Sequence, residues 1–190
     1  MNQTSIMIVG VGGQGTLLAS RLLGAAFMSQ GYDVKVSEVH GMSQRGGSVV
    51  TYVKYGEAIA SPIVDAGEAD YILAFEQLEA ARWVPYLRPG GKLIVNTQRI
   101  DPMPVITGVA EYPQGIIEAL VAGGAHVQAL DALALAEQAG SAKAVNVVLL
   151  GALAKQMDIP KEVWLEAVRG TVKPQFAQMN LTAFELGWEA

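Results

Sequence analysis

A glycine-rich turn near the N-terminus limits most strongly what this chain can fold into. Residues 10–15 read Gly-Val-Gly-Gly-Gln-Gly, and they join the apolar run 6–9 to a stretch with helical spacing of leucine and alanine. A first strand that passes through such a turn into a first helix is typical of open α/β sheets. The turn presents backbone N–H groups at the positive end of the helix dipole, and its usual occupant is an anionic group such as a nucleotide pyrophosphate.

Strands alternate with helices through about residue 130, and the remainder has helical spacing. The pattern predicts strands at 6–9, 33–38, 48–55, 71–75, 92–96 and 125–129, and helices at 17–30, 76–86, 115–121, 131–139, 142–156, 160–169 and 174–188. The first two strands and their helix are expected to form a βαβ opening. The turn at Gly56 and Glu57 predicts a hairpin with 58–60, and the three prolines in 101–113 predict an irregular segment.

These elements predict one α/β domain over residues 1–190. Its expected core, residues 1–130, is a Rossmann-like open, mostly parallel sheet with helices on both faces, and residues 131–190 form a helical C-terminal part and tail.

Composition excludes several classes of protein. The chain has 190 residues, a net charge of −5 and no basic stripe, so it does not have the character of a nucleic-acid binder. It contains no cysteine, which excludes disulfides, thiolate zinc sites, a catalytic thiol and cysteine-ligated iron–sulfur clusters, and which fits a cytoplasmic location. Its two histidines are far apart, so no metal-ligand spacing is present. We expect neither a signal peptide nor a membrane span.

The turn itself is the first candidate site. Gly10 allows a tight turn, Gly12 allows close approach of a ligand, and Gly15 lets the helix pack near the strand. Glu38 ends the second strand, where a dinucleotide-binding enzyme keeps a carboxylate for the ribose hydroxyls. An anionic ligand at this turn is the favoured interpretation; the alternative is that the glycines serve only packing and that Glu38 is solvated.

A second glycine-rich loop follows the second strand and is expected at the same sheet edge. Arg45 offers a forked cation suited to phosphate or carboxylate, and the neighbouring residues offer neutral donors or backbone amides. The loop is interpreted as a second anion clamp or as a segment that docks on a partner's active site, the alternative being an ordinary surface loop. Its candidate residues are Ser43, Gln44, Arg45, Gly46 and Gly47. His40 is either a general base or a loop histidine that makes a structural hydrogen bond. The second interpretation is favoured, because no acid or nucleophile accompanies it at a useful sequence distance.

Three further observations concern strand ends and the C-terminal helices. Glu76 is expected to be a carboxylate at the start of a helix. Asn96 and Thr97 are expected either to contact a ligand or to make hydrogen bonds within a turn. The helix at 142–156 is apolar around nearly its whole circumference apart from Lys143 and Asn146. Together with the aromatic tail it suggests an interface with another chain, the alternative being an intramolecular cap over the sheet.

Several catalytic patterns are missing from the sequence. It has no nucleophile elbow, no Walker lysine and no cluster of metal-ligand type, so we name no catalytic residue and no metal ligand. If the chain belongs to an enzyme, we expect another chain to hold catalytic parts.

Four motifs together resemble one family. They are Val-Gly-Val-Gly-Gly-Gln-Gly at 9–15, Glu-Val-His-Gly-Met-Ser-Gln-Arg-Gly-Gly-Ser at 38–48, Lys-Ala-Val-Asn at 143–146 and Asn-Leu-Thr-Ala-Phe-Glu-Leu-Gly at 180–187. Over nearly its whole length the chain resembles the gamma-type domain of 2-oxoacid:ferredoxin oxidoreductases, above all the beta subunit of the members that act on indolepyruvate. The run His-Gly-Met-Ser-Gln-Arg-Gly-Gly is the specific part of the match.

The resemblance implies an enzyme that decarboxylates a 2-oxoacid oxidatively on thiamine diphosphate, releases an acyl-CoA and passes electrons through iron–sulfur clusters to ferredoxin. The gamma-type domain does not bind thiamine and is implicated in CoA handling. Because the chain has no Gly-Asp-Gly sequence and no cysteine, thiamine diphosphate, magnesium and clusters are expected on a partner subunit. The family pattern places Gly10, Gly12, Gly13, Gln14 and Gly15, with the loop 43–47, near the shared active site.

Three hypotheses follow. The first is a non-thiamine-binding subunit of a cytoplasmic oxidoreductase that acts on an aryl pyruvate such as indolepyruvate. On this hypothesis the isolated chain is inactive, is a candidate homodimer and binds no cofactor tightly. CoA is its candidate ligand, and ferredoxin is contacted only indirectly. The second is a stand-alone NAD-dependent dehydrogenase, and the third is a purely structural assembly subunit.

Overall fold

The computed structural model describes residues 3–39 and 47–190. Within them, six strands form one sheet in the order β2-β3-β1-β4-β5-β6. The four strands β1, β4, β5 and β6 are parallel, and β3 runs antiparallel to both of its neighbours. The strands are β1 (Gln3–Val11), β2 (Asp33–Val39), β3 (Ser48–Gly56), β4 (Ala69–Ala74), β5 (Leu87–Asn96) and β6 (His126–Leu130). The prediction of an open, mostly parallel sheet is confirmed.

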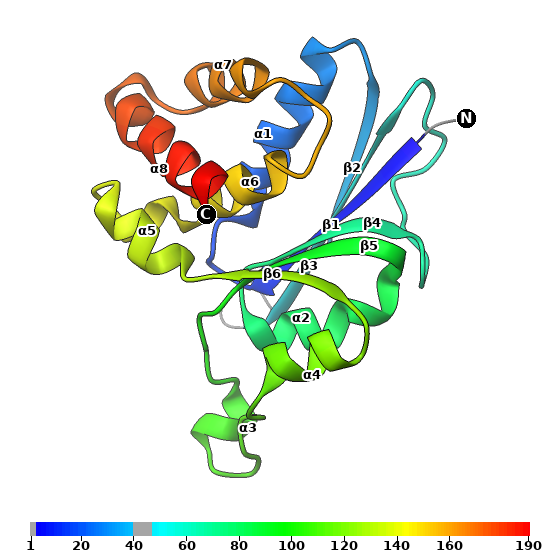
Figure 1. Ribbon diagram of the computed structural model, residues 1–190, viewed down its shortest axis with the longest axis vertical. Helices are drawn as coiled ribbons and strands as arrows, with labels where there is room; N and C mark the ends of the chain where they lie inside the picture. Colours follow the sequence, from blue (N-terminus) through cyan, green and yellow to red (C-terminus); the bar gives the residue numbers. More distant parts are fainter. Residues whose placement is uncertain (1–2, 40–46) are drawn as a thin grey trace.

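Helices cover both faces of this sheet, as predicted (Figure 1). One face carries α1 (Thr16–Ser29), α5 (Ala132–Gln138), α6 (Val145–Ala154), α7 (Lys161–Thr171) and α8 (Ala177–Glu189). The other carries α2 (Gln77–Trp83) and α4 (Ile116–Ala122), and the single turn α3 (Met103–Ile106) lies farther out. Short 3-10 turns are η2 (Val84–Tyr86), η3 (Ala142–Ala144) and η4 (Pro174–Phe176). In the described part of the chain, no helix combines the length and hydropathy needed to cross a bilayer.

Alternation along the strands divides the core into two layers. On β1, Ile6 and Ile8 pack among the residues of α1, α6 and α8, whereas Met7 and Val9 pack on the side of α2 and α4. All four side chains are fully buried. Successive side chains of a strand point to opposite faces, so an unbroken apolar run is what a central strand covered on both faces requires.

The strand order differs from the predicted βαβ opening at one position. The second strand, β2, is not the neighbour of β1; β3 lies between them. Polarity accounts for this order. β2 has mostly exposed or half-exposed side chains and carries Lys35 near its middle, which suits an open edge, whereas β3 buries residues of both faces.

The predicted hairpin after Gly56 is wrong. Residues 58–60 form no strand, and the chain runs irregularly until β4. Ile59 is nevertheless buried, and its N–H donates to the carboxylate of Asp33 at 2.8 Å. β3 pairs instead with β1 and β2, so the apolar side chain that suggested a strand is used to seal the end of the sheet.

The apolar helix α6 is buried within the chain and needs no second chain to cover it. All ten of its residues are buried, between the sheet and the C-terminal helix α8. The favoured interpretation of the sequence, an interface with another chain, is therefore wrong for this helix, and the intramolecular cap is correct. The two helices approach so closely that a Cβ on Gly187 would lie 1.9 Å from the carbonyl oxygen of Val148, and one on Gly151 would lie 2.2 Å from that of Phe184.

This helix contact yields a stability prediction. Gly187→Ala should lower the free energy of unfolding by about 3 kcal/mol, because the added methyl meets backbone and forces the helices apart. The control is Gly24→Ala in α1, where an added Cβ meets nothing within 4 Å and where alanine should raise stability by about 0.5–1 kcal/mol. Urea unfolding measures both, and an unchanged midpoint for Gly187→Ala would contradict the packing described here.

Candidate functional site

The glycine turn closes the end of β1 and begins α1. The Gly12 N–H donates to the Gly47 carbonyl at 2.9 Å, and the Gln14 N–H donates to the Val11 carbonyl at 3.2 Å. Gly15 is the N-cap of α1, with φ of 85° in the left-handed region. The turn is therefore fixed to β1 on one side and to the start of β3 on the other.

Three glycines of the turn are required for different physical reasons. A Cβ on Gly10 would lie 2.8 Å from Gln14 Oε1 and 2.9 Å from the Phe75 side chain. Gly13 has φ of 103° and no neighbouring atom within 4 Å of an added Cβ, so only its backbone conformation demands glycine. Position 15 requires glycine for two reasons: its φ is positive, and an added Cβ would lie 2.7 Å from Asn146 Nδ2.

The side chain of Gln14, predicted to lie near a ligand, joins the turn to the neighbouring strand. Its Oε1 accepts from the Val11 N–H at 2.7 Å, and its Nε2 donates to the Phe75 carbonyl at 2.9 Å. These contacts satisfy backbone groups of the last residue of β1 and of the residue just past the end of β4. Whether Gln14 also contacts a ligand stays a prediction.

Neutral amides continue across the carboxyl edge of the sheet. Asn96, fully buried at the end of β5, donates from Nδ2 to the Phe75 carbonyl at 3.1 Å and accepts from the Ala132 N–H at 3.2 Å. Gln98 Oε1 accepts from Asn96 Nδ2 at 3.3 Å and from Gln14 Nε2 at 3.4 Å. The strand ends are thus joined by amide hydrogen bonds. Of the two roles considered for Asn96, the structure shows hydrogen bonding to nearby backbone groups.

Two hollows meet at the glycine turn, and Gly13 and Gly15 line both. The first, of about 520 Å³, is called the Lys143 hollow; its lining is Gly13, Gln14, Gly15, Gln98, Leu133, Ala142, Lys143, Val145 and Asn146. The second, of about 360 Å³, is called the Val39 hollow; its lining is Gly12, Gly13, Gly15, Thr16, Leu17, Val39, Val49 and Thr51. Among these described residues, Lys143 is the one charged side chain.

The electrostatics around the turn favour an anion. α1 has 14 residues, and no side chain caps its first turn, so N–H groups there are left to a ligand or to solvent. Asn146 Nδ2 donates to the Gly15 carbonyl at 3.2 Å, while its buried Oδ1 has no hydrogen-bond partner among the described residues. The Lys143 hollow is therefore lined by a cation, and a buried amide oxygen that lacks a donor belongs to one of its lining residues.

The second predicted loop is described only at its C-terminal end. His40, Ser43, Gln44, Arg45 and Gly46 lie outside the described residues. Gly47 is described, and its carbonyl accepts from the Gly12 N–H, so the glycine turn and this end of the loop lie together as predicted. The hydroxyl of the next residue, Ser48, donates to the buried carboxylate of Glu79 on α2.

The position of Glu38 does not support the dinucleotide interpretation. Because β3 separates β2 from β1, Glu38 lies two strand spacings, about 10 Å, from β1 instead of one. Its carboxylate accepts from the Ser20 hydroxyl at 3.0 Å and lines a different surface of α1. The carboxylate that suggested NAD thus packs against the side of α1.

Glu76 caps α2, as predicted, and also fixes the chain that follows β5. Its buried carboxylate accepts from the N–H groups of Leu78 at 2.7 Å, Glu79 at 3.0 Å and Ile100 at 3.2 Å, and from the hydroxyl of Tyr112. Burial raises the pKa of Tyr112 well above its usual value, and the neighbouring Glu76 raises it further. Tyr112 therefore stays protonated and acts as the donor to Glu76.

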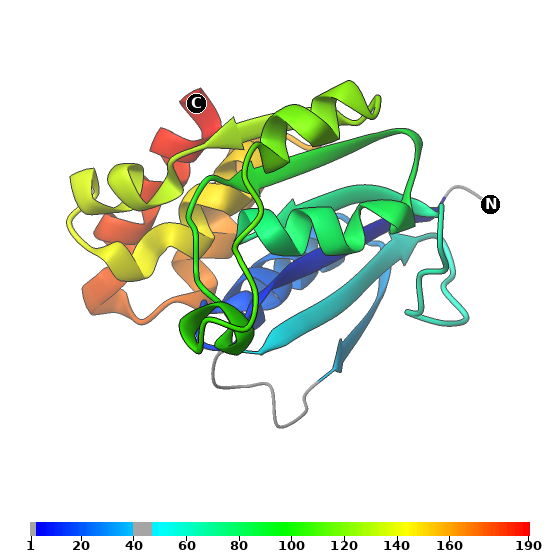
Figure 2. The same ribbon diagram turned by 90° about the horizontal axis from the view of Figure 1, so that it is seen from below.

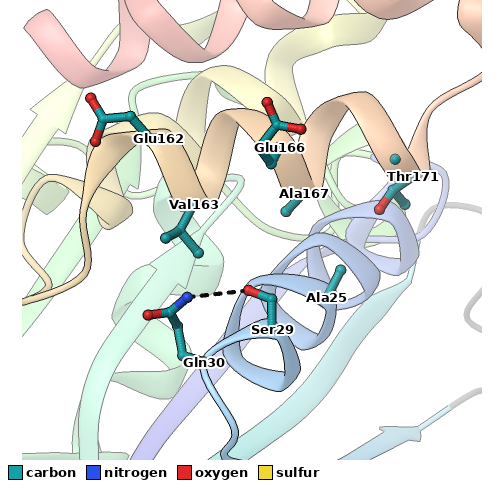
Figure 3. Close-up of a pocket in the computed structure, with 9 residues that line it drawn as sticks. Ala25, Ser29, Gln30, Glu162, Val163, Glu166, Ala167 and Thr171 are labelled. Carbon is teal, nitrogen blue, oxygen red and sulfur yellow. Dashed lines mark hydrogen bonds between the residues drawn. The ribbon is translucent and has the colours of Figure 1, made fainter.

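Another hollow, of about 560 Å³, lies between α1 and α7 (Figure 3). Figure 3 shows Val163 and Ala167 pointing toward α1, while the carboxylates of Glu162 and Glu166 point away from it. Its lining contains no lysine or arginine. We therefore do not consider it a site for an anion. Across residues 3–39 and 47–190, no group of three or more histidine or acidic side chains is arranged to hold a metal ion.

Sequence reasoning missed part of the site. Gln98 received no role, although its position just past the end of β5 was a usable signal, because carboxyl ends of parallel strands share one edge. Lys143 and Asn146 were noticed as polar exceptions on an apolar helix and as part of a family motif, but neither was assigned to the site. Their proximity to the glycine turn depends on how η3 and α6 fold back over the sheet, which spacing alone does not give.

Comparisons with known proteins agree on one family. Residues 5–190 match the family described as pyruvate ferredoxin/flavodoxin oxidoreductase. An indolepyruvate oxidoreductase subunit IorB from Thermococcus kodakarensis is 44% identical, with 100% of this chain and 96% of the relative covered. A keto/oxoacid ferredoxin oxidoreductase gamma subunit from Geobacter sulfurreducens has a TM-score of 0.74 at 24% identity, with 98% and 96% covered.

A further solved structure contains the same fold within a longer chain. It is a 2-oxoglutarate:ferredoxin oxidoreductase from Magnetococcus marinus with 2-oxoglutarate, coenzyme A and succinyl-CoA bound. Its TM-score is 0.73 at 20% identity, and the match covers 100% of this chain but 31% of that one. At this identity the likeness concerns the fold.

The contact between Gly15 and Asn146 can be tested with a matched pair of glycines. Gly13→Ala should cost about 1–2 kcal/mol of unfolding free energy, because alanine disfavours the left-handed conformation. Gly15→Ala should cost about 2 kcal/mol more, because its methyl also meets the Asn146 amide. In an Asn146→Ala background this difference should vanish, as measured by denaturant unfolding; equal losses for both glycines in the wild-type background would contradict the described contact.

Proposed function

This chain belongs to the pyruvate ferredoxin/flavodoxin oxidoreductase family, and from that membership we propose that it is the non-thiamine-binding subunit of a 2-oxoacid:ferredoxin oxidoreductase acting on an aryl pyruvate such as indolepyruvate. The assembled enzyme converts the 2-oxoacid and CoA into acyl-CoA and CO₂ and passes two electrons to ferredoxin. The names of the closely similar relatives, which are indolepyruvate oxidoreductase subunits, support the substrate class.

One observation supports the proposal that this chain binds a ligand while its partner carries out the reaction. The two hollows at the glycine turn offer uncapped helix N–H groups and Lys143, which are anion-binding groups, but their described lining contains no carboxylate or histidine for proton transfer. Such a site can hold and orient an anionic ligand without transforming it. The reaction itself is therefore assigned to another subunit.

The residues present do not fit thiamine diphosphate with magnesium, or iron–sulfur clusters. The chain has no cysteine to ligate iron, and its described acidic side chains form no metal-binding group. These cofactors are accordingly proposed for the partner subunit, where thiamine diphosphate supplies the decarboxylation chemistry.

CoA fits the glycine turn better than the other reactants do. Its phosphates carry several negative charges, which match the uncapped N-terminus of α1 and Lys143. A 2-oxoacid offers a single carboxylate to the same groups. We propose that Gly10, Gly12, Gly13 and Gly15 shape this site.

The remaining assignments complete the proposal. Gln14 supports the turn, and Ser43, Gln44, Arg45, Gly46 and Gly47 are proposed to contribute binding groups to the same site. The partner is the thiamine- and cluster-binding subunit, and ferredoxin meets that subunit rather than this chain. A cytoplasmic location remains a prediction from the cysteine-free composition.

Reconstitution tests the proposal directly. The isolated chain should show no CoA-dependent oxidation of indolepyruvate, because it lacks the cofactor ligands. Activity with ferredoxin or an artificial electron acceptor should appear when the thiamine-binding subunit of the same organism is added. Turnover by the isolated chain, or full activity of the partner alone, would refute the proposed division.

Lys143 provides a residue-level test in the reconstituted enzyme. Lys143→Gln should raise the KM for CoA about tenfold while leaving kcat at saturating CoA nearly unchanged, because one cation is lost from a binding site rather than from the reaction centre. The control is Lys155→Gln at the far end of α6. A rise in the KM for indolepyruvate instead of CoA would point to the 2-oxoacid as the ligand of this hollow.

A further inference from the structure

The segment between β5 and α4 projects from the body of the protein. It leaves the carboxyl edge of the sheet after Asn96, forms the single turn α3 and returns to α4 at Ile116. Figure 1 shows α3 standing apart from the helices that cover the sheet, and in Figure 2, seen from below, the same segment lies in front of the sheet. We call residues 101–111 the apolar finger.

The tip of the finger is apolar and uncharged. Residues 102–110 contain no charged side chain, and acidic residues flank them at 101 and 111. Met103 is 64% exposed, Ile106 66% and Val109 82%, the three highest values among the exposed large hydrophobic side chains of the described residues. Single exposed apolar residues are ordinary, but three on one projecting turn mark an interaction surface.

Internal contacts hold the finger in one shape. The Ile106 N–H donates to the Pro102 carbonyl at 3.1 Å, and the Val109 and Ala110 N–H groups donate to the Pro104 carbonyl at 2.8 and 3.0 Å. The tip is thereby closed into a compact turn. A surface fixed before binding loses less conformational entropy when it docks.

The base of the finger is anchored to the sheet edge. Glu76 accepts from the Ile100 N–H and the Tyr112 hydroxyl, one on each arm of the finger. The Arg99 guanidinium lies 4.4 Å from the centre of the Tyr112 ring, which joins the two arms again. The direction in which the finger projects is therefore set by a buried carboxylate.

The finger begins beside the candidate site. Gln98 lines the Lys143 hollow, accepts from Gln14 of the glycine turn and lies three residues before Asp101. A macromolecule that covers the Lys143 hollow from the carboxyl edge therefore meets a surface continuous with the finger. On the proposed function, that macromolecule is the thiamine-binding subunit.

Other occupants fit the finger less well. An anionic membrane surface attracts basic segments, but this tip is flanked by Asp101 and Glu111. Two fingers from two copies of this chain would bury on the order of a few hundred Å², against about 1,000 Å² for a specific interface. The finger is therefore suited to be one anchor within a larger interface.

We propose that the apolar finger inserts into an apolar groove of the thiamine-binding subunit and anchors this chain with its glycine turn facing that subunit. This inference rests on the proposed function and adds the docking element. Met103, Ile106 and Val109 form the inserted surface, and Glu76 and Tyr112 hold its base.

The test measures the affinity between this full chain and the thiamine-binding subunit of the same organism. Ile106→Glu and Val109→Glu should each weaken binding at least about 30-fold, because a carboxylate would be buried without a partner. The matched control is Val121→Glu on α4, which introduces the same charge at a valine 55% exposed away from the finger. The control should change affinity by less than about threefold, and melting temperatures should show that all three variants fold.

Catalysis separates docking from a role in the active site. At saturating concentrations of the finger variants, the reconstituted enzyme should regain the wild-type kcat, while the concentration needed for half-maximal activity rises with the measured Kd. A lowered kcat at saturation, or equal losses of affinity for Val109→Glu and Val121→Glu, would overturn the docking role.

The remaining outcomes distinguish the two proposals. If the wild-type chain binds the partner and the finger variants bind equally well, the finger inference fails and the proposed function stands. If the wild-type chain does not bind the partner, both fail. If Ile106→Glu converts a dimer of the isolated chain into a monomer without changing partner affinity, as seen by sedimentation, the finger pairs two copies and the inference is wrong.

Discussion

The carboxyl edge of the sheet depends on hydrogen bonds from neutral amide side chains. β1, β4 and β5 end beside one another, and the Phe75 carbonyl just past β4 is shared by Gln14 Nε2 and Asn96 Nδ2. A buried amide satisfies a donor and an acceptor together without the desolvation cost of a buried charge. These amides thus fix the strand ends beside which the glycine turn lies.

Sequence patterns were sufficient wherever local chemistry decides the structure. The turn at 10–15 requires glycine for backbone reasons that spacing reveals, and Glu76 caps α2 because a carboxylate before a helix accepts its first N–H groups. They were insufficient wherever two distant elements compete for one position. Nothing local shows that β3 displaces β2 from the side of β1, or that α8 rather than another chain covers α6.

The candidate site illustrates the same limit at the level of single residues. Gln14 belongs to the glycine motif, yet both polar atoms of its amide hydrogen-bond to the backbone of Val11 and Phe75. Lys143 and Asn146 belong to no anion-binding motif, yet they line the hollow beside Gly15 because η3 and α6 fold back over the sheet. A motif therefore pointed to the position of the candidate site, whereas the tertiary fold decides which side chains surround it.

On the proposed function, a site built in this way needs a second subunit for the reaction. Backbone N–H groups and one lysine can hold the phosphate end of a ligand, but a site without an acid or a base cannot by itself lower a reaction barrier. Binding energy gained at a remote part of a substrate accelerates a reaction only if the reacting end is delivered to a fixed place. In the proposed complex, that requirement falls on the geometry between subunits. The apolar turn that the buried carboxylate of Glu76 orients is the element we propose for setting this geometry.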